Sequence, residues 1–173
     1  MGEDPDREGL RRTPERVAAA YGELCRGLLP GSCKPISTME SCNQNELIIV
    51  KDISFASLCE HHLLPFLGRC DVVYLPANDR IAGLSSIVET VETMAARPTI
   101  QERLTTDIAE RLMEELCAKG VMVVMEAEHM CLAMRGVKKR DSRIVTSAMR
   151  GYMKRLETRT EALSLIGRSI GSR

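Results

Sequence analysis

Residues 99–134 read TIQERLTTDIAERLMEELCAKGVMVVMEAEHMCLAM, and this stretch decides the class of fold. Apolar side chains recur at every fourth position over residues 100–116, which predicts an amphipathic helix. Residues 99–102 have the pattern of a capping box, and Gly120 is the predicted C-cap. Residues 121–134 follow as an uninterrupted strand pattern. A long helix next to a long strand indicates a protein that combines both kinds of element.

The same patterns extend to both sides of this stretch. They predict a helix with Thr13 as its N-cap, strands at 46–57 and 68–76, a turn at 77–80, a helix at 85–97, a strand near 144–149 and a helix from Thr158. This order predicts an α+β fold with an antiparallel sheet. The 173 residues contain no repeat or linker, so we expect one domain. The chain begins at a turn-like segment, and we expect a further helix before it.

Composition excludes several classes of protein. Aromatic residues make up 3% of the chain, with no Trp, which argues against a stacking surface for nucleic acid. Lys and Arg number 24, as do Asp and Glu, so no net positive charge attracts a phosphate backbone. The acidic start is no signal peptide, and no apolar run is long enough to cross a membrane. Seven Cys, an odd number, indicate reduced thiols and a cytoplasmic protein.

The three histidines all lie within two residues of a cysteine. His61 and His62 follow Cys59, and His129 precedes Cys131. Two residues separate Cys59 from His62, a usual turn spacing for zinc ligands. Alternate residues of a strand share a face, so we expect His129 and Cys131 to point the same way. Thiolate and imidazole ligands favour zinc over magnesium or calcium.

The number of ligands separates a catalytic zinc from a structural one. A structural zinc takes four protein ligands, so it would need His61 or His129 besides Cys59, His62 and Cys131. Three ligands with a fourth position left to water form the catalytic pattern, which we favour. A Cys-rich core with incidental histidines is a further alternative.

Several stretches of this chain resemble the GTP cyclohydrolase I family. They are GEDPDREGL (2–10), TPERV (13–17), CEHHLLPF (59–66), GLS (83–85), QERLT (101–105), HMC (129–131) and MRGV (134–137). The resemblance implies a tunnelling fold, with an antiparallel sheet that carries two long helices on one face. Residues 1–45 would form an N-terminal helical arm and residues 46–173 the catalytic core. It also implies a homodecamer of two pentamers, with sites at subunit interfaces.

The family's reaction opens the imidazole ring of guanine at C8 and releases formate. Rearrangement of the ribose and ring closure then give 7,8-dihydroneopterin triphosphate, a step of pterin and tetrahydrofolate biosynthesis. Position by position, the resemblance implies zinc ligands Cys59, His62 and Cys131, proton carriers His129 and His61, and substrate contacts Glu102, Gln101, Ser85, Leu84 and Arg135. Glu102 would read the guanine N1–H and amino group, and Arg135 would contact the triphosphate.

Two positions depart from the family. Where it usually has a Lys and an Arg that hold the triphosphate, this chain has Ser86 and Glu89. A carboxylate about 5 Å from a phosphate charge costs roughly 3 kcal/mol at an effective dielectric near 20. The alternative is that Ser86 and Glu89 have a structural role only and form a helix capping box.

This departure leaves open what the chain acts on. In the first hypothesis the substrate is GTP, and its triphosphate is held by other basic residues, such as 138–140 or those of a neighbouring subunit. In the second, the substrate is a guanine compound with fewer phosphates. A non-catalytic zinc protein is a third hypothesis. The presence of both His61 and His129 argues against it, because a structural site needs no proton carriers.

Overall fold

The computed structural model describes residues 2–41 and 43–167. Within these residues the helices are α1 (Thr13–Leu24), α2 (Leu84–Ala95), α3 (Gln101–Glu115), α4 (Met130–Ala133) and α5 (Leu156–Gly167), with 3-10 turns η1 (Arg26–Leu28) and η2 (Tyr152–Lys154). The strands are β1 (Thr38–Glu40), β2 (Ile48–Cys59), β3 (Pro65–Leu75), β4 (Arg80–Ala82), β5 (Pro98–Thr99), β6 (Gly120–His129) and β7 (Arg143–Gly151). The chain is therefore an α+β protein, as the sequence predicted.

Five strands form the main sheet in the order β5-β2-β3-β6-β7. Its long strands pair antiparallel, and only the short β5 runs parallel to its neighbour β2. Strands β1 and β4 form a separate antiparallel pair. Within the described residues β7 is an edge strand of the main sheet, since its pairing partner is β6 alone.

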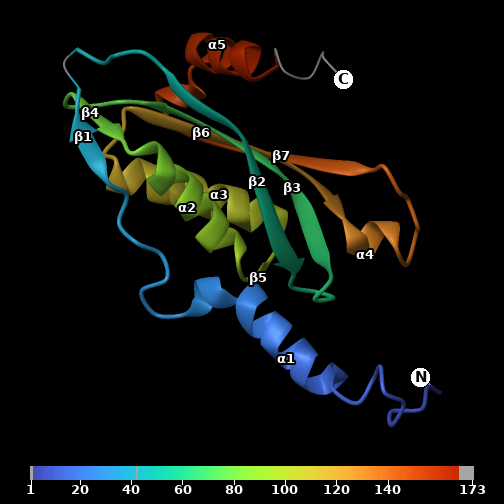
Figure 1. Cartoon of the computed structure of the whole chain (residues 1–173). Helices are drawn as coiled ribbons and strands as arrows, with labels where there is room; N and C mark the ends of the chain where they lie inside the picture. Colours follow the sequence, from blue (N-terminus) through green and yellow to red (C-terminus); the bar gives the residue numbers. More distant parts are fainter. Residues whose placement is uncertain (1, 42, 168–173) are drawn as a thin grey trace.

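Helices α2 and α3 cover one face of this sheet (Figure 1). The apolar side chains at every fourth position of α3, Leu104, Ile108 and Leu112, are fully buried there. Sheet residues such as Val72 and Val123 pack against them. On the opposite face α5 covers one end of the sheet, where Ala162 and Ile166 join a second apolar cluster.

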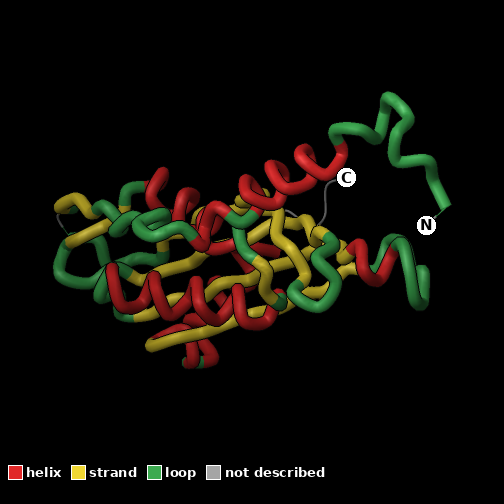
Figure 2. Tube along the Cα trace, turned by 90° about the horizontal axis from the view of Figure 1, so that it is seen from below, coloured by secondary structure: helices red, strands yellow, loops and turns green. Residues whose placement is uncertain are grey.

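The N-terminal segment extends away from this core. All of α1 is described, and none of its residues is buried. Figure 2 shows the helix and the segment before it projecting beyond the sheet. The hydroxyl of Tyr21 donates to the carbonyl oxygen of Leu63, and the amide of Gly27 donates to the carbonyl oxygen of Ala96. These bonds link the N-terminal segment to the turn after β2 and to the end of α2.

The predicted helix caps are wrong. The N-cap positions of α1, α2 and α3 are Arg12, Gly83 and Ile100. Thr99 is unavailable as a cap because it ends β5, pairs with Cys59 and bonds its hydroxyl to the carbonyl oxygen of Ile100. The left-handed residue after α3 is Cys117, with a φ of 46°, whereas Gly120 begins β6.

The strand predicted over residues 121–134 also ends early. Strand β6 stops at His129, and residues 130–133 turn into α4. Apolar side chains continue through α4, so the pattern alone gave no sign of the change. The predicted free thiols agree with the six described cysteines, none of which is in a disulfide, while Cys42 lies outside the described residues. No helix in the described part of the chain has the length and apolar character needed to cross a bilayer.

Candidate metal centre and active site

Strand β2 ends in a tight turn that folds His62 back over Cys59. The amides of His62 and Leu63 donate to the carbonyl oxygen of Cys59, at 3.2 and 2.8 Å. Leu63 has a φ of 52°, in the left-handed region that residues other than glycine seldom adopt. The turn leaves Sγ of Cys59 3.8 Å from Nδ1 of His62. The sequence spacing of these two residues thus becomes proximity in space.

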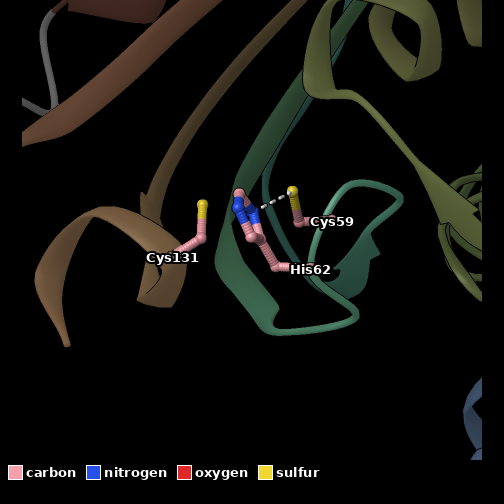
Figure 3. Close-up of side chains that lie close together, drawn as sticks. All are labelled: Cys59, His62 and Cys131. Carbon is pink, nitrogen blue, oxygen red and sulfur yellow. Dashed lines mark hydrogen bonds between the residues drawn. The ribbon is translucent and has the colours of Figure 1, made fainter. Parts of the chain in front are cut away.

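The third candidate ligand, Cys131, comes from the other side of the group. Figure 3 shows Cys59 and His62 on the turn between β2 and β3, and Cys131 on α4. One ligand atom from each of the three lies within 4.8 Å of the other two. Strand alternation, which we expected to align His129 with Cys131, does not produce this arrangement, because Cys131 lies in a helix. The turn from β6 into α4 produces it.

Electrostatics at this group favour a bound cation. Burial raises the pKa of the Cys131 thiol, and the neighbouring Cys59 raises it further, whereas Arg135 lowers it. Two adjacent thiols resist ionising together, and a cation bound by both reverses that penalty. Two thiolates and one imidazole are the sulfur and nitrogen donors that zinc prefers. The residues present therefore fit a zinc ion.

Two of the three candidate ligands, Cys59 and Cys131, line a cavity of about 250 Å³, which we call the metal-side cavity. Its lining residues are Cys59, His61, Thr99, Ile100, Gln101, Glu102, His129, Cys131, Leu132 and Ile144. They come from the ends of β2, β5 and β6, the start of α3, α4 and the start of β7. The structure thus brings both predicted proton carriers, His61 and His129, to the cavity of the predicted zinc ligands.

His129 ends β6 and is held on two sides. Its ring stacks on that of Phe66, with centroids 4.6 Å apart and planes 2° from parallel. Its Nε2 atom lies 2.8 Å from Oε1 of Gln101. Burial lowers the pKa of His129, and the nearby carboxylate of Glu102 opposes that shift. Burial therefore favours the neutral imidazole.

Gln101, a predicted substrate contact, lines the metal-side cavity and is bonded within the protein. Only 1% of this residue is exposed. Its Nε2 atom lies 3.1 Å from the carbonyl oxygen of Met125 and 3.0 Å from that of Ile144. Since Oε1 faces His129, both ends of the amide are engaged within the protein. A contact between Gln101 and a substrate stays a prediction.

Glu102 lies in the first turn of α3, and its side chain is exposed. Ile100 is the N-cap of this helix, so the alternative capping-box role of Glu102 with Thr99 is excluded. His61, across the cavity, is also exposed, and its ring lies edge-on to that of His62 with centroids 6.2 Å apart. Both residues are open to a molecule in the cavity.

Arg135, the predicted triphosphate contact, lies next to a candidate metal ligand. Its Nη1 atom lies 2.6 Å from Nε2 of His62, and the residue is exposed just beyond α4. The structure thus places Arg135 at the metal group.

The remaining predicted substrate residues lie elsewhere. Leu84 and Ser85 begin α2, and Ser86 and Glu89 follow in its first turns. Ser86 and Glu89 line a second pocket, of about 190 Å³, which we call the helix-end pocket. Its lining residues are Arg26, Ser32, Lys34, Pro35, Ser86, Glu89, Thr90, Glu92 and Thr93. Because Gly83 is the N-cap of α2, the alternative capping box of Ser86 and Glu89 is not formed.

Two basic residues of the helix-end pocket were missed in the sequence. Arg26 and Lys34 line the pocket together with the altered positions. No local pattern could have identified them, because more than 50 residues separate them from Ser86 and Glu89. Residues 138–140, the basic run considered above, follow α4 and are not among the residues that line this pocket.

The family model and the similar proteins of known name point to the same family. The family model described as GTP cyclohydrolase I matches residues 1–167. GTP cyclohydrolase 1 of Carboxydothermus hydrogenoformans is 49% identical over 96% of this chain and 88% of its own length. The enzymes of the same name from Streptomyces avermitilis and Clostridioides difficile are each 50% identical over 96% of this chain, and over 83% and 88% of their own lengths.

A solved structure shares the fold at much lower identity. The archaeosine synthase QueF-Like, in its apo form, superimposes with a TM-score of 0.50 and 16% sequence identity. The match covers 61% of this chain and 93% of that one. At this identity the likeness concerns the fold alone.

Proposed function

The chain belongs to the GTP cyclohydrolase I family and is thus an enzyme of that type, and on this premise we propose that it is a zinc-dependent hydrolase that opens the guanine imidazole ring at C8 and releases formate. The proposed overall reaction converts GTP into 7,8-dihydroneopterin triphosphate for pterin and tetrahydrofolate biosynthesis. One observation carries the proposal. Cys59, His62 and Cys131 converge, and Cys59 and Cys131 line the same cavity as His129 and Glu102.

Cys59, His62 and Cys131 would hold the zinc ion. Three protein ligands are the number found in catalytic zinc sites. When bound, such an ion lowers the pKa of a water molecule to about 7, which supplies a nucleophile at neutral pH. Arg135, beside His62 and Cys131, adds a positive charge that favours the thiolate form of Cys131.

The other residues of the cavity would bind the base and move protons. His129, kept neutral by burial, can accept a proton and later return it. His61 stands across the cavity as a second proton carrier. The carboxylate of Glu102 accepts two N–H bonds at once, which suits the N1–H and amino group of guanine. Gln101 acts behind His129 in this scheme.

A second copy of the chain would complete the site. Helix α2 has 12 residues and spans roughly 18 Å. Ser86 and Glu89 lie near its start, whereas Thr99, which pairs with Cys59, follows its end. Because Ser86 and Glu89 lie at the opposite end of α2 from Thr99, the base and the phosphates would contact different copies.

Sheet geometry supports an assembly of this kind. Strand β7 is an edge strand with Val145 62% exposed, and an open edge can pair with another strand. The proposed assembly is a homodecamer of two pentamers with sites between subunits. Each subunit would be one domain of tunnelling fold, with residues 1–45 as its N-terminal arm and 46–173 as its core.

A second candidate substrate is a guanine nucleotide, nucleoside or base without the triphosphate. The charges of the helix-end pocket favour it, because Glu89 and Glu92 offset Arg26 and Lys34. A pocket without net positive charge attracts a triphosphate weakly.

Turnover of a substrate series tests both candidates. Zinc-loaded protein is incubated with GTP, GMP, guanosine and guanine, and formate and pterin fluorescence are followed. Faster turnover of GTP supports the first candidate, and faster turnover of the shorter compounds supports the second. If no compound releases formate, the proposed reaction is wrong.

A further inference from the structure

Gln101 is a fully buried polar side chain next to the proposed chemistry. It is the first residue of α3 and 1% exposed. Its Nε2 atom lies within 3.1 Å of three oxygens, the carbonyls of Met125 and Ile144 and the hydroxyl of Thr146. On the other side, its Oε1 atom lies 2.8 Å from Nε2 of His129. A buried amide with this many partners has one orientation open to it.

The two carbonyl oxygens fix which end of the amide faces His129. Carbonyl oxygens only accept hydrogen bonds, so they require the NH₂ end. A flipped amide would set its own oxygen against the carbonyl oxygens of Met125 and Ile144 and leave a buried donor unmatched. Oε1 of Gln101 therefore faces the ring of His129.

Two threonines next to Gln101 support the same orientation of its amide. The hydroxyl of Thr105 donates to the backbone oxygen of Gln101 at 2.7 Å. Its oxygen is then left to accept from the hydroxyl of Thr146, 2.6 Å away. Thr146 has thereby used its own proton and can only accept from Nε2 of Gln101. All three oxygens around Nε2 of Gln101 therefore act as acceptors and share its two hydrogens, which again places the NH₂ end of the amide toward them.

The hydrogen bond to Gln101 also fixes where His129 carries its proton. Because Oε1 of Gln101 is an acceptor, Nε2 of His129 must carry a hydrogen. The ring of Phe66, 4.6 Å away and parallel within 2°, restricts the plane of the imidazole. In the neutral imidazole the lone pair then belongs to Nδ1.

We propose that Gln101 is a positioning residue that holds His129 as the Nε2–H tautomer and makes Nδ1 the atom that exchanges a proton with the substrate. The tautomer follows from the hydrogen bonds alone, and its catalytic consequence rests on the proposed function. A proton taken up at Nδ1 leaves the Nε2–H bond to Gln101 intact, and its return to the leaving group restores the starting state.

Nitrogen NMR spectroscopy reads the tautomer directly from the chemical shifts of the two ring nitrogens. The signals are few, because the chain has three histidines. Zinc-loaded protein labelled with ¹⁵N-histidine is compared with the His61→Gln and His129→Asn variants to assign the signals. In the wild type, Nε2 of His129 is expected to show the shift of a protonated nitrogen and Nδ1 that of an unprotonated one. A proton on Nδ1 in the wild type overturns the proposal whether or not any substrate is turned over.

Two substitutions test the role of Gln101 itself. Gln101→Met keeps the volume but removes the acceptor, so the His129 signals are expected to move toward a tautomer mixture and kcat to fall on the order of 100-fold with little change in KM. Gln101→Glu keeps an acceptor for Nε2–H of His129 but sets an oxygen against the carbonyls of Met125 and Ile144, so it is expected to retain the tautomer at a lower melting temperature. Unchanged signals and kcat in Gln101→Met contradict the proposal.

The control variant removes a hydroxyl that lies outside the metal-side cavity on a residue about as buried as Gln101. Thr90→Val removes a group that is 3% exposed and bonds the carbonyl oxygen of Ser86 on α2. It is expected to lower the melting temperature while the His129 signals stay unchanged. If Thr90→Val moves these signals as far as Gln101→Met does, the effect is one of stability and the proposal fails.

Discussion

The metal-side cavity takes its residues from strand ends and the start of α3, whereas the helix-end pocket takes them from α2 and the segment at residues 26–35. In the first, Gln101 and His129 are held by bonds to buried groups. In the second, Arg26, Lys34, Glu89 and Glu92 are exposed and form no ion pair with any described residue. The reactive groups thus depend on the sheet, while the charges of the other pocket can change without disturbing the fold.

The largest effect is expected from removing a metal ligand. Cys59→Ser and Cys131→Ser should each lose bound zinc and reduce turnover roughly 10³-fold or more, since a catalytic metal contributes several kcal/mol. Metal content per chain and formate release measure the two losses. Cys117→Ser, an exposed cysteine just after α3, is the control. Full zinc content and turnover in either ligand variant would show that the three residues are not the metal site.

A smaller effect is expected at the base-reading position of the same cavity. Glu102→Gln removes a charged acceptor, and hydrogen bonds to charged groups contribute about 1.5–3 kcal/mol. We expect kcat/KM to fall roughly 10- to 100-fold with zinc content unchanged. Glu110→Gln is matched to it, because Glu110 is exposed on the same helix and pairs with Arg150. Equal effects of the two variants would remove Glu102 from the site.

The dependence of the metal-side cavity on the sheet is tested at Gly68. A Cβ there would collide with the backbone oxygen of Glu126 and with Ala127, on the strand that ends at His129. Gly68→Ala should destabilise the fold by about 1–3 kcal/mol and impair zinc binding as well.

Chemical denaturation and metal titration measure these two changes. Gly22→Ala in α1, where a Cβ meets nothing within 4 Å, should be neutral or slightly stabilising. A Gly68→Ala protein of normal stability and zinc affinity would contradict the dependence on the sheet.

The smallest effect is expected at the helix-end pocket. Ser86→Lys with Glu89→Arg adds two positive charges and removes a negative one, a net change of +3, and exposed charges contribute up to about 1 kcal/mol each. We expect KM for GTP to fall roughly tenfold, KM for guanosine to stay constant and stability to change little. Added salt should make this decrease in KM for GTP smaller, because it screens the charges.

A matched control carries the same charge change on another helix. Ser164→Lys with Glu161→Arg repeats the three-residue spacing on exposed positions of α5. It should leave KM for GTP unchanged. If the α2 pair has no more effect than the α5 pair, the helix-end pocket does not receive the phosphates.

The sequence by itself determined the main helices and strands and pointed to the candidate reactive groups. The four-residue period of Leu104, Ile108 and Leu112 specified α3, because such a stripe must be buried on one side. The clustering of three histidines beside cysteines pointed to a zinc site. Cys59 and His62 were predictable as a pair, since two intervening residues suffice for one turn.

Only the tertiary structure decided how these groups face one another. The apolar pattern continues past His129, so the change from β6 to α4 that brings Cys131 to Cys59 left no mark in it. The inward direction of Gln101 depends on carbonyl groups of β6 and β7, 24 and 43 residues away. Local patterns record which side chains avoid water, whereas these contacts depend on where distant backbone groups come to lie.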